Sequence, residues 1–356
     1  MISTTPTRIG TGELGTEPVI IRSRAPLRIS FAGGGTDVPP YCDDRGGAIL
    51  SATINRYAYA TIIPGGERFE VESLDYDASI SYGIDDAFVY DGQLDLAKGT
   101  LDHFRKAYKL SGGLSIALHN DAPPGSGLGS SSAITVALVR ALSEQVRRPL
   151  DDYELADLAY RIERLEVGIK GGKQDHYAAA FGGFNFMEFV DGGAVVTPLR
   201  LKSQTLYELE YSMVFAYVGG QHFSGHLIER QMENYKSKKV DSVGAMDTLK
   251  ALAFDMKRAL LLGRMGDFGE ILNAGWEAKK KMADGITNPR IDEIYAQARK
   301  AGALGGKITG AGGGGFMFFM CEPGRLFSVQ KALRSLDAQI VNFSFVEEGV
   351  KSWTLS

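Results

Sequence analysis

The stretch of sequence that decides the fold reads Pro123-Pro124-Gly125-Ser126-Gly127-Leu128-Gly129-Ser130-Ser131-Ser132-Ala133. The apolar segment Leu114 to Leu118 predicts a strand that enters it, and the periodicity of Ala133 to Val146 predicts a helix that leaves it. Glycine lets the backbone approach a ligand without Cβ obstruction, and the amides and dipole of a helix start favour an anion. The loop is therefore predicted to hold phosphate, with a flexible serine-capped turn as the structural alternative.

The loop differs from the two commonest nucleotide-binding loops. No lysine follows its glycines, and it lacks the third glycine of the dinucleotide fingerprint. An oxidoreductase with a Rossmann domain is disfavoured for this reason and because no flanking βαβ pattern is present. Two further glycine clusters, Gly33–Asp37 and Gly310–Gly315, each adjoin an apolar run. The loop is thus one of three glycine-rich segments spread along the chain.

Composition and charge limit the class of protein. With 356 residues, 44% of them hydrophobic and 23% charged, the chain is long enough for two domains with cores of their own. Lys and Arg number 39 against 43 Asp and Glu, so no overall field attracts nucleic acid or a membrane surface. No apolar run approaches the roughly 20 residues that span a bilayer. The distant Cys42 and Cys321 suit a reducing cytoplasm.

The pattern of the chain indicates a tail and two units. Residues 1–18 are predicted to be a flexible tail without signal-peptide character, 19–200 an N-terminal unit of mixed strands and helices, and 201–356 a C-terminal unit rich in helices. The boundary is expected at Asp191-Gly192-Gly193 and the polar stretch around Leu201–Glu208. Asp151 and Glu154 fit a capping box for a helix over 152–167. The other expected helices are 95–110, 133–146, 242–262, 267–282 and 289–301, and the expected strands are 19–31, 48–63, 114–118, 213–218, 315–320 and 338–345.

Taken together, the three glycine-rich segments resemble the motifs of a known family. Pro26-Leu27-Arg28-Ile29 leading to Gly33–Asp37, the Pro123–Ala133 loop and Lys307–Gly314 are similar in order and spacing to those of the GHMP kinase superfamily, over residues about 22 to 320. Arg28–Pro39 and Gly171–Asp175 look most like the D-glycero-D-manno-heptose 7-phosphate kinases, with the fucokinases as near relatives. The resemblance implies an α+β fold in which an S5-like N-terminal domain and a ferredoxin-like C-terminal domain flank the active site.

This resemblance also implies an activity. It is the ATP- and Mg²⁺-dependent phosphorylation of the anomeric hydroxyl of D-glycero-D-manno-heptose 7-phosphate to the 1,7-bisphosphate, for nucleotide-activated heptose and surface polysaccharide. The sugar phosphate would be the small-molecule partner, and homo-oligomer formation stays open. A fucokinase-like enzyme is the nearest rival. A non-catalytic sugar or nucleotide sensor on the same fold is the rival of another class, and the joint presence of Asp175, Glu163 and Ser132 argues against it.

The nucleotide site implied by the resemblance lies in the serine-containing loop. Its expected residues are Pro124, Gly125, Ser126, Gly127, Leu128, Gly129, Ser130, Ser131 and Ser132. Ser132 and Glu163 are expected to hold Mg²⁺, because phosphoryl transfer needs a divalent cation beside the β- and γ-phosphates. Glu166 is the alternative ligand one turn along. The structural alternative for Glu163 is a surface pair with Arg161 or Lys170.

The resemblance makes Asp175 the base that accepts the proton of the attacking sugar hydroxyl, and Arg28 the cation beside it. Asp175 could instead cap the next helix, and Arg28 could instead pair with Asp37. For the phosphate that the acceptor already carries, Lys173 is preferred over His176, His222 and Lys307. The segment Tyr217–His222 departs from the Thr-Gly-x-Ser-Arg pattern common in heptose kinases, which leaves the identity of the sugar open. The expected substrate-binding residues are Gly34, Gly35, Thr36, Asp37, Lys173, His176, Gly312 and Gly313.

Overall fold

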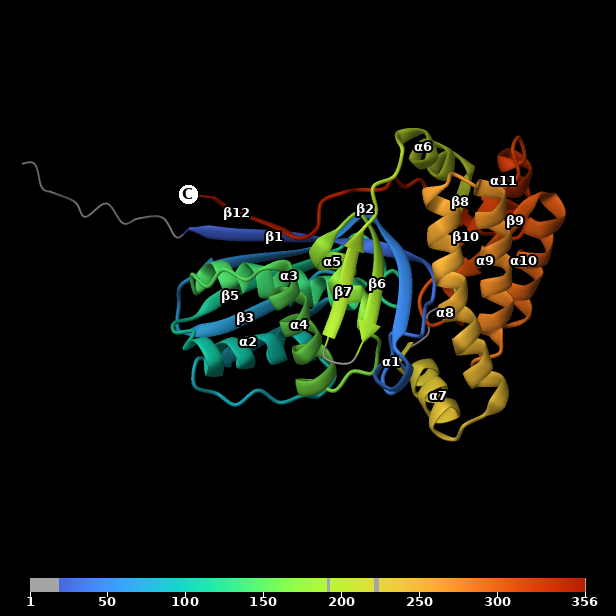
Figure 1. Ribbon diagram of the computed structural model, residues 1–356. Coiled ribbons are helices and arrows are strands. Elements are labelled where there is room, and N and C mark those ends of the chain that lie inside the picture. Colours follow the sequence, from blue (N-terminus) through green and yellow to red (C-terminus); the bar gives the residue numbers. More distant parts are fainter. Residues whose placement is uncertain (1–18, 191–192, 221–223, 356) are drawn as a thin grey trace, which may run out of the picture.

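Two β-sheets organise the chain in the computed structural model, which describes residues 19–190, 193–220 and 224–355 (Figure 1). Among these residues the first sheet has eight strands and the second four. The first sheet comprises β1 (Ile20–Ala32), β2 (Gly47–Pro64), β3 (Arg68–Ser73), β4 (Ala78–Gly83), β5 (Leu114–Asn120), β6 (Phe184–Val190), β7 (Gly193–Pro198) and β12 (Lys351–Leu355). The second comprises β8 (Met213–Gly219), β9 (Ala303–Ile308), β10 (Gly315–Cys321) and β11 (Gln339–Ile340).

The strand order of the first sheet is β12-β1-β2-β5-β3-β4, with β6 paired to the other end of β2 and β7 paired to β6. All pairings are antiparallel except β3 with β5. The long strand β2 pairs through residues 58–64 with β5 and through residues 47–52 with β6. The second sheet is antiparallel in the order β11-β8-β10-β9. The α+β expectation is confirmed.

The helices divide between the two sheets (Figure 1). Those in the first half of the chain are α1 (Tyr41–Arg45), α2 (Asp95–Tyr108), α3 (Ser130–Gln145), α4 (Asp152–Tyr160) and α5 (Gln174–Phe181), with a π-helical segment, η1 (Arg161–Glu166), after α4. The second half contributes α6 (Ser203–Ser212), α7 (Ser224–Lys236), α8 (Val240–Leu261), α9 (Met265–Lys280), α10 (Pro289–Ala301) and α11 (Leu326–Arg334). In the described residues, no helix is both long and apolar enough to cross a membrane.

Several expected elements differ from the structure. The single helix expected over 152–167 keeps its capping box at Asp151 and Glu154 but changes from α-helix to π-helix at Arg161. The polar stretch Leu201–Glu208 contains the start of α6, and its place at a domain boundary stays a prediction; Asp191 and Gly192 lie outside the described residues. The strand expected over 338–345 is limited to β11, followed by an isolated bridge between Phe345 and Ile54. The last strand, β12, returns from the C-terminal half to pair with β1.

The two sheets meet in a shared apolar core. Phe31, at the end of β1, lies 5.4 Å from the ring of Phe268 on α9 and 5.7 Å from the ring of Phe318 on β10, measured between ring centroids. Aromatic pairs at such distances add to the stability that burial alone provides. The loop Gly33–Asp37, which follows Phe31 directly, is therefore held against the C-terminal half of the protein.

Candidate active site

The loop between β5 and α3 has the geometry predicted for it. Gly125, Gly127 and Gly129 all have positive φ, between 74° and 78°, a region that favours glycine. Helix α3 begins at Ser130, so all three serines of the run lie in its first turn, where backbone amides have no partner within the helix. The loop therefore presents amides, hydroxyls and a helix start together, as phosphate binding requires.

The third glycine-rich segment supports this loop from behind. The hydroxyl of Thr309 donates to the carbonyl of Ser126 at 2.9 Å. A Cβ added at Gly127 would lie 2.6 Å from the carbonyl oxygen of Thr309, so the loop rests directly on the backbone after β9. Gly312 and Gly313, which are predicted to bind substrate, also pack against the backbone of the protein itself. Both lie against Ile286, and the Gly313 amide donates a hydrogen bond to the Ile286 carbonyl at 2.9 Å.

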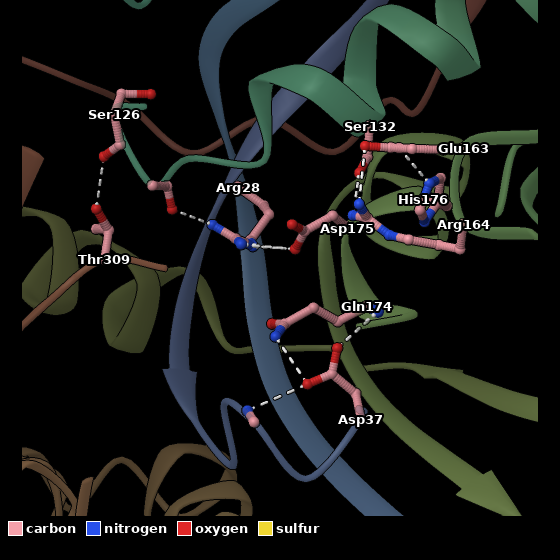
Figure 2. Close-up of polar contacts among 12 residues, drawn as sticks. Arg28, Asp37, Ser126, Ser132, Glu163, Arg164, Gln174, Asp175, His176 and Thr309 are labelled. Atoms are coloured by element: carbon pink, nitrogen blue, oxygen red, sulfur yellow. Dashed lines mark hydrogen bonds and ion pairs between the residues drawn. The ribbon is translucent and has the colours of Figure 1, made fainter. Parts of the chain in front are cut away.

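Arg28 and Asp175 form the centre of the site (Figure 2). Arg28, on β1, contacts Asp175 Oδ1 through Nε at 2.8 Å and Nη2 at 2.6 Å, and its Nη1 donates to the carbonyl of Gly127 at 2.6 Å. Asp175 lies in the first turn of α5 and does not cap that helix. Its Oδ2 makes no hydrogen bond with the described residues, and a Cβ added at Gly129 would lie 3.5 Å from it. One carboxylate oxygen of Asp175 is thus fixed by Arg28, and the other lies beside the predicted phosphate loop.

Asp37 orders the neighbouring loop and does not pair with Arg28. Its carboxylate accepts hydrogen bonds from the amide of Gly35 at 3.1 Å, from the amide of Gln174 at 3.0 Å and from Nε2 of Gln174 at 3.1 Å. Thr36 is also bound internally, to the backbone of Ala48. These contacts set the path of residues 33–37 beside α5, while direct contact of Asp37 with a sugar stays a prediction.

Glu163 lies in a buried network instead of on the surface. Its carboxylate accepts hydrogen bonds from the Ser131 hydroxyl and from His176 Nε2, each at 2.6 Å. Arg164 contacts Glu163 Oε1 at 3.0 Å and donates to the hydroxyl of Ser132 at 3.2 Å. Burial alone would raise the pKa of Glu163, but Arg164 and His176 outweigh it and hold that pKa well below its usual value. Glu163 is therefore ionised, and the guanidinium of Arg164 is its counter-charge.

Ser132 and Glu163 stay a prediction as Mg²⁺ ligands, and in the structure a protein cation already contacts both. The guanidinium of Arg164 bridges Ser132 and Glu163, which is the place that a cation held by both would take. Mg²⁺ demands near-octahedral oxygen coordination and keeps several waters, whereas the Glu163 side chain is wholly buried. Within the described residues no group of three His, Cys, Asp or Glu side chains could hold a metal. The alternative ligand Glu166 points away, to His103 at 2.9 Å.

Two of the predicted substrate residues have other partners. Lys173 forms an ion pair of 3.0 Å with Asp43 and keeps 19% of its side chain exposed. His176 is fully buried against Glu163, so its ring lies inside the N-terminal half. His222 lies outside the described residues.

Sequence reasoning missed Lys279 and Gln231, and it gave Lys307 only a minor place. Lys279 lies in the last turn of α9 and resembles an ordinary cation at a helix C-terminus. Lys307 directly precedes the third glycine-rich segment, which was the one available signal. In the structure both lysines are buried beside Gly34, and Gln231 of α7 is buried beside Gly35.

Comparisons with known proteins agree on one kind of protein. The family model for the GHMP kinases N terminal domain matches residues 95–183, and that for the GHMP kinases C terminal matches residues 256–338. A D-glycero-alpha-D-manno-heptose 7-phosphate kinase of Campylobacter jejuni is 40% identical over 94% of this chain and 99% of its own. A crystal structure of a D-glycero-D-manno-heptose 1-phosphate kinase from Bacteroides thetaiotaomicron is 40% identical, with a TM-score of 0.79 over 94% of this chain and 99% of the other. A bifunctional fucokinase/GDP-fucose pyrophosphorylase of Arabidopsis thaliana is 25% identical over 86% of this chain and 30% of its own.

Proposed function

Since the chain belongs to the GHMP kinases, phosphotransferases that use ATP and an alcohol acceptor, we propose that it phosphorylates the anomeric hydroxyl of D-glycero-D-manno-heptose 7-phosphate. The product would be the 1,7-bisphosphate, an intermediate for nucleotide-activated heptose and surface polysaccharide. A cytoplasmic location is also part of the proposal, and the use of ATP and two buried free cysteines support it.

The observation that carries the proposal is the position of Asp175. Its Oδ1 is held by Arg28, which in turn is fixed to the carbonyl of Gly127 in the phosphate loop. A carboxylate that lies between a cation and a phosphate loop, with one oxygen available, can orient a hydroxyl towards a bound phosphate. A sugar sensor needs no such group, so the catalytic role is favoured over the sensor.

In the proposed reaction the anomeric oxygen attacks the γ-phosphorus of ATP. A bond forms between that oxygen and phosphorus, the bond from phosphorus to the β,γ-bridging oxygen breaks, and ADP leaves. The hydroxyl proton passes to Oδ2 of Asp175. Arg28 holds the carboxylate of Asp175 in place and adds positive charge near the transferred group.

Mg²⁺ is part of the proposal as a companion of the nucleotide, because its usual role is to neutralise the β- and γ-phosphates. Because Arg164 bridges Ser132 and Glu163, the structure gives no support to these two residues as direct ligands of Mg²⁺. We therefore give this pair a positioning role: Glu163 holds Ser131, and Arg164 holds Ser132, at the start of α3.

The choice of acceptor rests on the relatives. Both heptose-specific relatives reach 40% identity over nearly the whole chain, whereas the fucokinase relative reaches 25%. The two heptose kinases are described with phosphate at different carbons of the acceptor, 7 and 1. Only the 7-phosphate leaves the anomeric hydroxyl unsubstituted, which the proposed reaction requires.

The proposal is tested by measuring ADP release from ATP with four acceptors: D-glycero-D-manno-heptose 7-phosphate, the 1-phosphate, the unphosphorylated heptose and L-fucose. We expect the highest kcat/KM with the 7-phosphate and no turnover of the 1-phosphate. A preference for fucose would replace the proposed acceptor, and turnover of the 1-phosphate would place the reaction at another hydroxyl.

A further inference from the structure

Two buried lysines from the C-terminal half converge on the loop Gly33–Asp37. Lys279, on α9, and Lys307, on β9, are only 3% and 5% exposed. Lys279 Nζ donates to the carbonyl of Gly34 at 2.9 Å, and Lys307 Nζ lies 3.7 Å from the position that a Cβ on Gly34 would take. Lysine is almost never buried to this degree unless an anion accompanies it.

No carboxylate within the described residues pairs with either lysine. The nearest acidic group that influences them is Asp37, and its oxygens already accept hydrogen bonds from Gly35 and Gln174. Arg28 is a third cation near these two lysines, and it is paired with Asp175. The two lysines are therefore buried basic groups without a counter-charge among the described residues.

The same place holds polar groups that lack partners among the described residues. They are the hydroxyl of Ser30, Nε2 of Gln231 and Oε1 of Gln174, all of them buried. Ser30 and Gln231 would contact a Cβ added at Gly34 and at Gly35 respectively, within 3.5 Å. Because buried polar groups in native proteins nearly always have partners, this concentration around one loop indicates a polar ligand.

We propose that Lys279 and Lys307 bind the phosphate that the acceptor sugar already carries, with Ser30 and Gln231 as neutral partners. The inference rests on the proposed function and identifies the group that selects a phosphorylated acceptor. A phosphate dianion supplies the charge and the several acceptor oxygens that the two lysines lack.

The competing source of phosphate is the nucleotide. It is disfavoured because both lysines lie against the loop 33–37, whereas the nucleotide loop has its own amides, helix start and serines. In Figure 2, Asp37 and Gln174 of this region lie below the Arg28–Asp175 pair, and the Ser132–Glu163 network lies above it. Lys173 is disfavoured as the main cation because it already pairs with Asp43.

Burial gives this site a measurable signature. It lowers the pKa of Lys307 to about 7 and that of Lys279 to about 8, with Lys279, Arg28 and Asp37 as the charged groups that face Lys307. At pH 8 Lys307 is mostly neutral in the unliganded protein. A bound dianion favours the charged form, so binding takes up about one proton per acceptor.

The experiment is titration calorimetry at pH 8 in two buffers of different ionisation enthalpy. The wild-type protein is titrated with D-glycero-D-manno-heptose 7-phosphate and with the unphosphorylated heptose. We expect proton uptake with the phosphorylated sugar alone. Equal affinity for the two sugars would overturn the proposal, and this comparison needs no variant.

Variants locate the site. Lys307→Met and Lys279→Met should each weaken binding of the 7-phosphate about tenfold or more, beyond any change with the unphosphorylated sugar. Lys281, an exposed lysine at the end of α9, provides the matched control. Lys281→Met should bind the 7-phosphate in preference to the unphosphorylated sugar as strongly as the wild type does. Loss of affinity for a non-hydrolysable ATP analogue in Lys307→Met, or loss of the preference in Lys173→Met alone, would overturn the proposal.

Failure of this inference can be told apart from failure of the proposed function. Turnover of the 7-phosphate by the wild-type enzyme decides the function, whereas the calorimetry decides the site. If the enzyme makes the 1,7-bisphosphate while Lys307→Met and Lys279→Met both keep the preference for the phosphorylated sugar, the function stands and the site is wrong.

Discussion

Arg28 and Asp175 are 147 positions apart in the sequence, yet their side chains form an ion pair of 2.6 Å. The pair joins β1 to the first turn of α5, and Arg28 extends it to the phosphate loop through Gly127. A fixed carboxylate beside a phosphate loop is the feature on which the proposed phosphoryl transfer depends.

Asp175→Asn should lower kcat by about two orders of magnitude or more, because it keeps the shape and removes the proton acceptor. Affinity for a non-hydrolysable ATP analogue should stay near that of the wild type. Steady-state kinetics and calorimetry measure the two quantities, and thermal unfolding checks the fold. Asp267→Asn, exposed on α9, is the control. Near-normal kcat in Asp175→Asn would move the search for the base to Asp37.

Ser130→Asp should remove the stabilisation of the protein by ATP without weakening the free protein. A carboxylate in the first turn of α3 interacts favourably with the helix dipole but repels the phosphates. Thermal unfolding with and without ATP measures both effects, and Ser130→Asn provides a neutral control of similar shape. This substitution is cleaner than one at Gly127, where a side chain would collide with Thr309. If Ser130→Asp kept the full shift with ATP, the phosphate-loop assignment would be wrong.

Glu163→Gln should lower the free energy of unfolding by about 3–5 kcal/mol near neutral pH, because it leaves Arg164 without its buried counter-charge. The folded-state pKa of Glu163 is depressed, so its stabilisation is present above the unfolded pKa of about 4.3 and is lost as the pH falls. Urea unfolding at pH 6 and pH 3.5 should show the difference between the two proteins shrink in acid.

Glu166→Gln is the matched control for this prediction, since Glu166 follows in the same π-helical segment but is bound only to His103 near the surface. Its effect should be below about 1 kcal/mol. Equal effects of the two substitutions would contradict the buried network.

Lys307→Met should stabilise the unliganded protein, because it replaces a buried and unpaired cation with an apolar side chain of similar length. Burial lowers the folded-state pKa of Lys307 to about 7, so the unfolded chain binds more protons between about pH 7 and 10. The free energy of unfolding of the wild type therefore rises with pH because of this group. The difference in free energy of unfolding between Lys307→Met and the wild type should shrink from pH 7 to pH 10. Chemical unfolding at three pH values, with Lys281→Met beside it, measures this. A difference in free energy of unfolding that does not vary with pH would contradict the lowered pKa of the buried Lys307.

Much of the architecture could be predicted because it depends on local signals. The capping box at Asp151 and Glu154 and the strand before the phosphate loop are local in the sequence, and the structure confirms both. The π-helical segment at Arg161 was not predictable from apolar periodicity, since one extra residue in a turn changes which side chains share a face. That change accompanies the inward position of Glu163.

The candidate site could be predicted only where glycine clusters and motif spacing mark it. Arg28 and Asp175 were named in this way, but the partner of Arg28 is set by tertiary structure. Lys279 is an ordinary lysine in its local sequence, and Lys307 is marked only by its place at the start of the third glycine-rich segment. Their convergence on Gly34 arises from packing of the two halves, which no local pattern encodes.

The most direct test of the account is ³¹P NMR of the reaction of the wild-type protein with ATP and D-glycero-D-manno-heptose 7-phosphate. We expect a new resonance from phosphate on the anomeric oxygen, formed together with ADP, while the 7-phosphate resonance persists. Asp175→Asn should form this product at least about a hundredfold more slowly. ADP without an anomeric phosphate, or equal product formation by Asp175→Asn, would contradict it.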